Sequence, residues 1–99
     1  MKELHATGNW IFTLPESIGE LSELRLLDLR NNRLRELPKS FDKLQHLEQL
    51  DLRSNLLTTL PESISQLPRL EKLDLRWNKI RVEPDWLKAL NERGCTIYQ

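Results

Sequence analysis

The chain has 99 residues, of which 15 are lysine or arginine and 15 are aspartate or glutamate, so its formal net charge is zero. A neutral chain lacks the basic excess with which nucleic-acid-binding domains and polybasic membrane-surface modules attract phosphate groups, so we expect neither partner. Its 38% hydrophobic and 30% charged residues are typical of a globular domain, and no apolar run approaches the roughly 20 residues needed to span a bilayer.

Leucine is unusually frequent, with 22 copies against 3 glycines, and it recurs with a period of 23 residues. The period that begins at Leu24 has leucine at its first, fourth and sixth positions, asparagine at its ninth, and then Leu-Pro. The same order returns from Leu47 and, except for the leucine before proline, from Leu70, and a looser copy begins at Met1. The predicted organisation is one domain, 1–99, with a degenerate repeat 1–23, full repeats 24–46, 47–69 and 70–92, and a C-terminal capping strand 93–99.

Each repeat begins with a predicted strand around a Leu-x-Leu unit, such as Leu50-Asp51-Leu52. Side chains alternate along a strand, so the leucines face inward and the charged residue faces outward. One such strand is too short to bury a core, so successive repeats are expected to stack into a parallel sheet over shared leucines. The asparagine that follows, such as Asn55, is expected to bond backbone groups of neighbouring turns that would otherwise be buried unpaired.

Each Leu-Pro is followed by a segment with apolar residues three positions apart, such as Ile18 and Leu21. Proline is tolerated in the first turn of a helix. This spacing predicts a one- or two-turn helix or a 3₁₀ turn on the convex side of the stack.

The last repeat departs from the pattern, because Glu83 stands where the other repeats have leucine. We expect Val82 or Trp86 to fill that space. The final segment is predicted to form a last strand with Cys95 and Ile97 facing inward, in a register one residue shorter than the period. Together with Trp86, this strand would form a modest cap.

The first repeat starts directly in strand register, with Met1 and Leu4 in the apolar columns. An unpaired strand edge with exposed apolar surface favours association. Two explanations remain open: the chain is the tail of a longer array, or this edge is used in self-association.

A single cysteine, Cys95, cannot form an intramolecular disulfide, and the chain has no Asn-x-Ser/Thr site for glycosylation. Small secreted domains usually depend on several disulfides. The first residues also lack the apolar stretch of a secretory signal. We therefore expect a cytoplasmic protein.

The complete pattern, L-x-x-L-x-L-x-x-N-x-L-x-x-L-P-x-x-[IF]-x-x-L, resembles the leucine-rich repeat family, and its 23-residue period with Leu-Pro is similar to the intracellular, Ras-suppressor-like class also found in plants and bacteria. The resemblance implies an α/β fold: a right-handed solenoid with a short parallel sheet on the concave face and short helices or 3₁₀ turns on the convex face. It also implies that function resides on the concave face.

On that face the aspartates of successive strands form one column, and the arginines two residues later form another beside it. Adjacent parallel strands lie roughly 4.8 Å apart, so members of the two columns can contact each other. Arginine pairs bidentately with carboxylates and is enriched at interfaces, so the stripe can recognise a partner of complementary charge. Alternatively, the two columns neutralise each other. The candidate partner-binding residues are Asp28, Arg30, Asp51, Arg53, Lys72, Asp74, Arg76 and Trp77.

Two tryptophans flank the asparagine column. Trp77 is predicted to face solvent beside Arg76, as in binding hot spots; alternatively, it folds over the last strand as a lid onto Tyr98. Trp10, at the other end, is expected to cap the open first turn.

No catalytic constellation is apparent. His5 and His46 have no cysteine or carboxylate at metal-binding spacing, the glycines form no phosphate loop, and the arginines oppose a divalent cation beside the aspartates. We expect no enzyme activity, no cofactor and no metal.

The leading hypothesis is a protein–protein interaction module that binds a partner of unknown identity on its concave face. The alternatives are a self-assembling unit that uses its N-terminal edge, and the recognition arm of a larger signalling enzyme, such as a GTPase, kinase or ubiquitin ligase.

Overall fold

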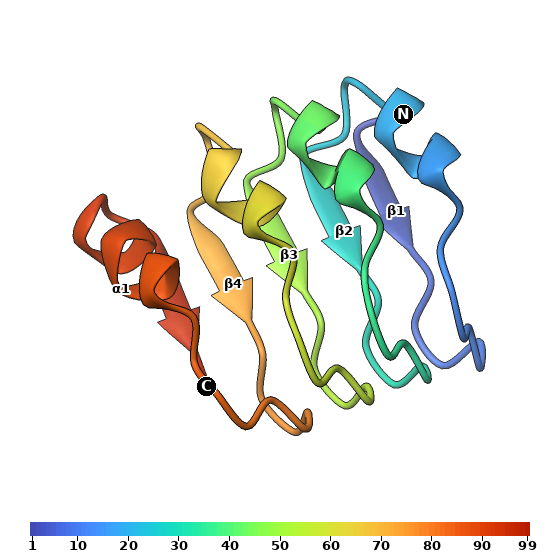
Figure 1. Cartoon of the computed structure of the whole chain (residues 1–99). Helices are drawn as coiled ribbons and strands as arrows, with labels where there is room; N and C mark the ends of the chain where they lie inside the picture. The colour runs from blue at the N-terminus through green and yellow to red at the C-terminus, as the bar shows by residue number, and fades with distance from the viewer.

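The computed structural model describes residues 1–99, and it consists of successive coils of chain that lie side by side (Figure 1). Each coil contributes a three-residue strand, and the strands form one parallel five-stranded sheet in chain order. The strands are β1 (Glu3–His5), β2 (Leu26–Asp28), β3 (Gln49–Asp51), β4 (Lys72–Asp74) and β5 (Thr96–Tyr98).

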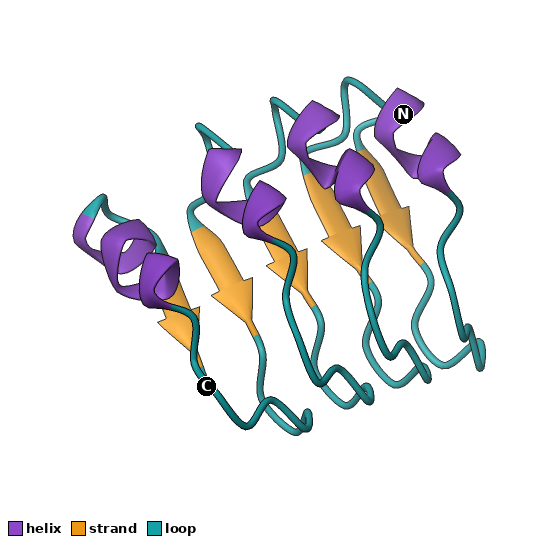
Figure 2. Cartoon of the chain, viewed as in Figure 1, coloured by secondary structure: helices purple, strands orange, loops and turns teal.

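Short helical segments line the side of the coils opposite the sheet (Figure 2). They are three 3₁₀ helices, η1 (Glu16–Glu20), η2 (Lys39–Lys43) and η3 (Glu62–Gln66), and one α-helix, α1 (Asp85–Glu92). A proline with extended backbone precedes each of these segments. Its fixed φ ends the extended loop, and the helical turn begins at the next residue. The fold is therefore the expected α/β solenoid. None of its helices is long and apolar enough to cross a membrane.

The strand register confirms the period of the first four strands, since Leu4, Leu27, Leu50 and Leu73 pair in line. The last strand has the expected inward residues, but its predicted register is wrong. Leu73 pairs with Ile97, so the last coil is one residue longer than the others, not one shorter. The reason is that this coil carries α1, which has eight residues where each 3₁₀ helix has five.

The core is a single cluster of 20 buried apolar residues, dominated by the stacked leucines of the middle coils. Leu29, Leu52 and Leu75 are all buried, as the alternation predicted. Leu4 and Leu14 of the first coil are only partly buried against this cluster. Burial is therefore complete in the middle of the array and incomplete at its N-terminal end.

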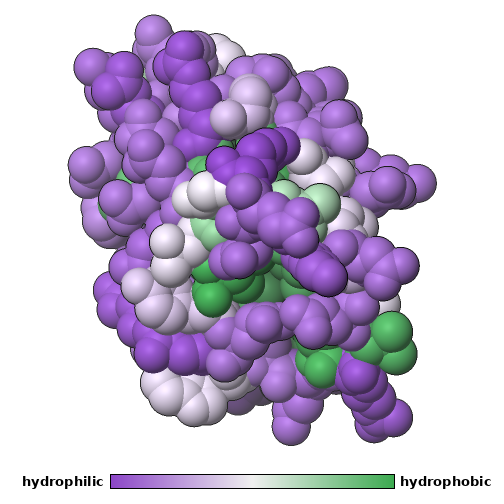
Figure 3. Space-filling model, turned by 90° about the vertical axis from the view of Figure 1, so that its left-hand side faces the viewer, coloured by the Kyte–Doolittle hydropathy of each residue, from purple (hydrophilic) through white to green (hydrophobic).

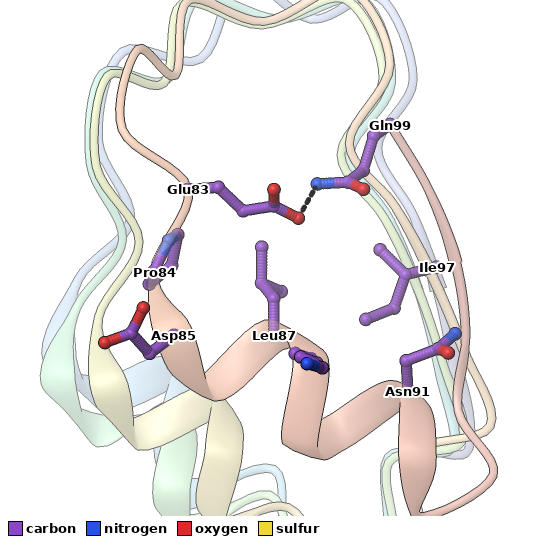
Figure 4. A pocket seen from close by; sticks show the side chains of 8 residues that line it. Glu83, Pro84, Asp85, Leu87, Asn91, Ile97 and Gln99 are labelled. Atoms are coloured by element: carbon purple, nitrogen blue, oxygen red, sulfur yellow. Dashed lines mark hydrogen bonds between the residues drawn. The ribbon is translucent and has the colours of Figure 1, made fainter.

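The C-terminal end is incompletely covered. Val82 is 82% exposed and does not replace the missing leucine, whereas Trp86 does pack against the core. The Gln99 Nε2 atom donates a hydrogen bond to Glu83 Oε1 at 2.5 Å, across a hollow of about 600 Å³ that Leu87 and other residues line (Figure 4). Apolar surface is visible in the middle of this end, surrounded by hydrophilic residues (Figure 3).

Buried or half-buried asparagines form a ladder through the middle and last coils, as predicted, whereas Asn9 of the first coil is exposed. The Asn55 Nδ2 group donates to the carbonyl oxygens of Leu29 at 2.9 Å and Leu52 at 3.1 Å, and Asn55 Oδ1 accepts from the Leu34 amide at 3.0 Å. Asn32 and Asn78 make equivalent bonds. We call Asn32, Asn55 and Asn78 the asparagine ladder. It ties each coil to its neighbours at the point where the chain leaves the sheet.

Candidate functional site

Each aspartate on the exposed sheet face is held by the arginine two residues later, because residues two apart in a strand point to the same side. The Arg53 Nε atom lies 3.0 Å from Asp51 Oδ1, and Arg53 Nη2 lies 2.6 Å from Asp51 Oδ2. The pairs Asp28–Arg30 and Asp74–Arg76 have the same two-point geometry. The backbone amide of each arginine also donates to the carboxylate, which fixes the aspartate side chain.

These pairs also contact each other across the strands. The Arg30 Nε atom lies 3.6 Å from Asp51 Oδ2, and Arg53 Nε lies 3.3 Å from Asp74 Oδ2. The six residues of these three pairs are called the aspartate–arginine ladder from here on. His5 extends it toward the N-terminus, with Nδ1 3.8 Å from Asp28 Oδ2. Mutual neutralisation of the two columns is therefore a feature of the fold.

The aspartates of the ladder are more buried than a position on an exposed face suggests: Asp74 is 1% exposed, and Asp28 is also buried. Burial alone would raise the pKa of Asp74, but the hydrogen bonds from the Arg76 side chain and amide outweigh it and hold the pKa below its ordinary value. The pKa of Asp28 is lowered in the same way, by Arg30. The hydrogen bond to Asp74 in turn raises the pKa of Arg76. Asp28 and Asp74 therefore stay ionised at neutral pH.

Aromatic and cationic side chains gather at the C-terminal end of the same face. The Arg76 guanidinium lies 5.5 Å from the centre of the Trp77 ring and 5.1 Å from that of Tyr98, within the range of a cation–π contact. Lys72 Nζ lies 5.5 Å from the Tyr98 ring. Trp77 is 68% exposed, so it does not cover the last strand as a lid.

Trp77 also has an unusual backbone, with φ of +61°. The equivalent residues of the other coils, Gly8, Asn31 and Ser54, have positive φ as well. Glycine and asparagine adopt this left-handed conformation readily, whereas a bulky aromatic residue is strained there. The residues Gly8, Asn31 and Ser54 at this position are the signal in the sequence for a left-handed turn.

Trp10, the other flanking tryptophan, does not cap the first turn. Its ring is 64% exposed and is not among the residues that pack against the core. The Arg33 guanidinium of the next coil lies 4.0 Å from its centre instead. The prediction of a capping role is therefore wrong.

All eight candidate residues lie on the strands or immediately after them, and the structure joins them into two groups. One is the aspartate–arginine ladder, and the other is Lys72 and Trp77 around Arg76 and Tyr98. Tyr98, which the sequence suggested only as a residue beneath a Trp77 lid, also belongs to this face. The signal was available, since Tyr98 follows the inward Ile97 in the last strand and must point outward.

The arrangement offers charged, aromatic and hydrogen-bonding groups that suit recognition. No three histidine, cysteine, aspartate or glutamate side chains lie where they could hold a metal ion. The aspartates already bind arginine, and burial raises the pKa of the Cys95 thiol, which disfavours the reactive thiolate.

Comparisons with known proteins agree with this geometry. A family model described as "Leucine rich repeat" matches residues 1–57 and 22–80. A solved leucine-rich repeat protein of Leptospira interrogans is similar over 100% of this chain, with a TM-score of 0.88 and 40% sequence identity. The chain spans only 25% of that protein. No curated protein matches the chain.

Proposed function

We propose that this chain, which belongs to the leucine-rich repeat family, binds a protein partner on the strand-bearing face of its sheet and performs no chemistry. The leucine-rich repeat fold generally mediates protein–protein interactions, and solenoids offer extended concave surfaces for this purpose. Such proteins are typically non-catalytic. For this chain we propose in addition which face, which residues and which contacts bind the partner.

The observation that carries the proposal is the state of Trp77. Its large ring is exposed to water on a left-handed backbone, where the other coils use Gly8, Asn31 or Ser54. Both features cost free energy in the isolated chain, and neither adds to the core. Strained residues cluster at binding and active sites, and tryptophan and arginine are enriched in interface hot spots.

The aspartate–arginine ladder still has unused donors. The bonds within the ladder come from the Nε, Nη2 and backbone amide groups of Arg30, Arg53 and Arg76, and none comes from their Nη1 groups. The aspartates hold these guanidinium groups in place, so a partner's carbonyl or carboxylate oxygens meet donors that are already oriented. Because the charges are balanced, the ladder favours specificity over long-range attraction.

The experiment is affinity capture from lysate, with quantification of each recovered protein by mass spectrometry. The site variant is Arg53→Glu/Trp77→Ala. The control is Lys39→Glu/Val82→Ala, which makes the same change in charge and removes an exposed apolar side chain away from this face. We expect proteins retained by wild type and control to be lost from the site variant. Equal recovery by all three would reject the assigned face.

We also propose that the protein is cytoplasmic. We further propose that its repeats belong to the 23-residue Ras-suppressor-like class. The single buried cysteine and the Leu-Pro spacing support this placement. Immunofluorescence of the tagged native protein tests it.

A second candidate function is self-assembly through the N-terminal edge of the sheet, where strand β1 has only β2 as a neighbour. Met1 and Phe12 are exposed at the N-terminal coil. Light scattering over a range of concentrations tests this function, since a strict monomer would reject it. A role as the recognition arm of a larger enzyme stays a prediction that the sequences adjoining Met1 and Gln99 would test.

A further inference from the structure

The loops that follow the strands form a second surface, outside the proposed docking face. After Asn9, Asn32 and Asn78 the chain exposes two residues that flank a more buried apolar one, as Arg33 and Arg35 flank Leu34. The coils are held in line here by backbone bonds, from the Arg33 amide to Ile11 O at 2.9 Å and from the Lys79 amide to Leu57 O at 2.8 Å. These loops lie along the lower side of the coils in Figure 1. We call their exposed residues the basic loop surface: Trp10, Phe12, Arg33, Arg35, Lys79 and Arg81.

The cations of the basic loop surface have no acidic partner. Arg33, Arg35, Lys79 and Arg81 are all exposed. Every carboxylate within 4.0 Å of an arginine or lysine in this chain belongs to the aspartate–arginine ladder, so none of these four is paired. The net charge of zero therefore hides an uneven distribution, with a local positive surface on the loops.

One of these cations is held ready by aromatic rings. The Arg33 guanidinium lies 4.0 Å from the centre of the Trp10 ring and 6.0 Å from that of Phe12. Trp10 has φ of +59°, so a second exposed tryptophan occupies a strained backbone position beside an arginine. The rings restrict the guanidinium and leave its N–H groups unbonded within the protein, which lowers the entropy lost when it binds an oxyanion.

The positive groups are separated by one neutral coil. Leu56 and Thr58 stand between Arg33 and Arg35 on one side and Lys79 and Arg81 on the other. Two coil spacings amount to roughly 10 Å, which is about three residues of a chain extended in the polyproline II conformation, where residues three apart face the same side. Leu56 is half-buried and offers an apolar contact midway.

We propose that the basic loop surface binds an extended acidic protein segment, with two carboxylates about three residues apart and an apolar side chain between them. The neutral coil favours a peptide over a nucleic acid, because phosphates follow one another without interruption and need a continuous positive track. Glu36 and Glu83 flank the surface in sequence and would repel a longer polyanion.

The test is a binding titration followed by NMR of the ¹⁵N-labelled chain. The probe is a synthetic peptide with glutamates at positions three apart and leucine between them, and its control has glutamine in place of glutamate. A single-stranded oligonucleotide and phosphatidylserine vesicles serve as competing anions. The protein variants are Arg33→Glu/Lys79→Glu and a charge-matched control on the helical side, Lys39→Glu/Lys88→Glu. Circular dichroism confirms that each variant is folded.

We expect the glutamate peptide to shift the Trp10 indole and Arg33 amide signals, and the loop variant, which loses two exposed ion pairs, to weaken its binding by about tenfold. The Lys39/Lys88 control should bind as wild type. Absence of peptide binding, equal binding of the glutamine peptide, or tighter binding of the oligonucleotide or vesicles would overturn the proposal. The Arg53→Glu/Trp77→Ala variant should retain this peptide, so failure here and failure of the strand-bearing face are distinguishable.

Discussion

The asparagine ladder and the aspartate–arginine ladder repeat with the same period and lie a few residues apart, but the asparagine amides and the arginine guanidinium groups have opposite environments. The amide of Asn55 is sealed between coils and bonds only to the backbone. The guanidinium of Arg53 is partly exposed and bonds only to side chains. A buried polar group that loses its partner pays a full desolvation cost, whereas an exposed one is solvated by water. The asparagine ladder therefore contributes to stability, and the arginines of the aspartate–arginine ladder are available for recognition.

The largest expected effect is that of Asn55→Ala. The change leaves the Leu29 and Leu52 carbonyls and the Leu34 amide without their partner, and it should lower the free energy of unfolding by about 2–4 kcal/mol. Urea denaturation measures the loss. The matched control is Asn9→Ala in the exposed first copy of the column, which should stay within about 0.5 kcal/mol of wild type. Equal losses at both positions would remove burial as the cause.

The next largest effect on stability is expected at Asp74, the most buried aspartate of the aspartate–arginine ladder. Its pKa is lower in the folded than in the unfolded chain, so the unfolded chain binds more protons as the pH falls. This stabilisation is complete above the unfolded pKa and is lost as the pH falls through the folded pKa. We expect Asp74→Asn to lower stability at neutral pH by about 1–2 kcal/mol and to flatten the acid limb of the pH–stability profile.

Urea denaturation between neutral and acidic pH measures that profile. The Asp28→Asn variant should flatten it as well, because Arg30 lowers the pKa of Asp28 in the same way. An acid limb as steep as that of wild type in both variants would mean that the ladder does not hold its aspartates ionised.

Trp77→Asn should act in the opposite direction and stabilise the chain by about 1 kcal/mol, because asparagine tolerates positive φ better than tryptophan. Thermal unfolding checks the gain. Trp77→Phe keeps the strain and should show no such gain. A loss of stability in the asparagine variant would assign the ring a role in the fold and weaken its role as a binding anchor.

Arg53→Gln should have the smallest effect on folding. Asp51 remains beside Arg30 at 3.6 Å, and Asp74 retains Arg76. We expect an unfolding midpoint close to that of wild type together with reduced partner recovery in the capture experiment. A midpoint lowered as far as that of Asn55→Ala would mean that Arg53 stabilises the fold as much as the asparagine ladder does.

The repeat alone was sufficient to predict the parallel sheet, the buried leucine columns and the asparagine bonds. Each depends on a pattern of local periodicity, since residues one period apart must meet when the coils stack. The eight candidate residues were likewise placed near the sheet face by alternation in the strand.

The ends of the chain were predicted less well, because no neighbouring repeat constrains them. The exposure of Val82, the stacking of Trp10 on Arg33 and the longer last coil depend on how α1 and the loops settle against one open side of the core. Spacing in the sequence contains no information about that balance.

Two properties of the candidate surfaces followed only from the three-dimensional structure. The distances between Arg30 and Asp51 and between Arg53 and Asp74 depend on side-chain conformations across strands, which decide that the ladder charges are neutralised. The unpaired state of Arg33 and Lys79 depends on the absence of any carboxylate within reach from every other coil. The 23-residue period is enough to predict which residues share a column, because residues one period apart lie next to each other when the coils stack. Which of them pair is decided by packing between columns, where angles and distances select the partners.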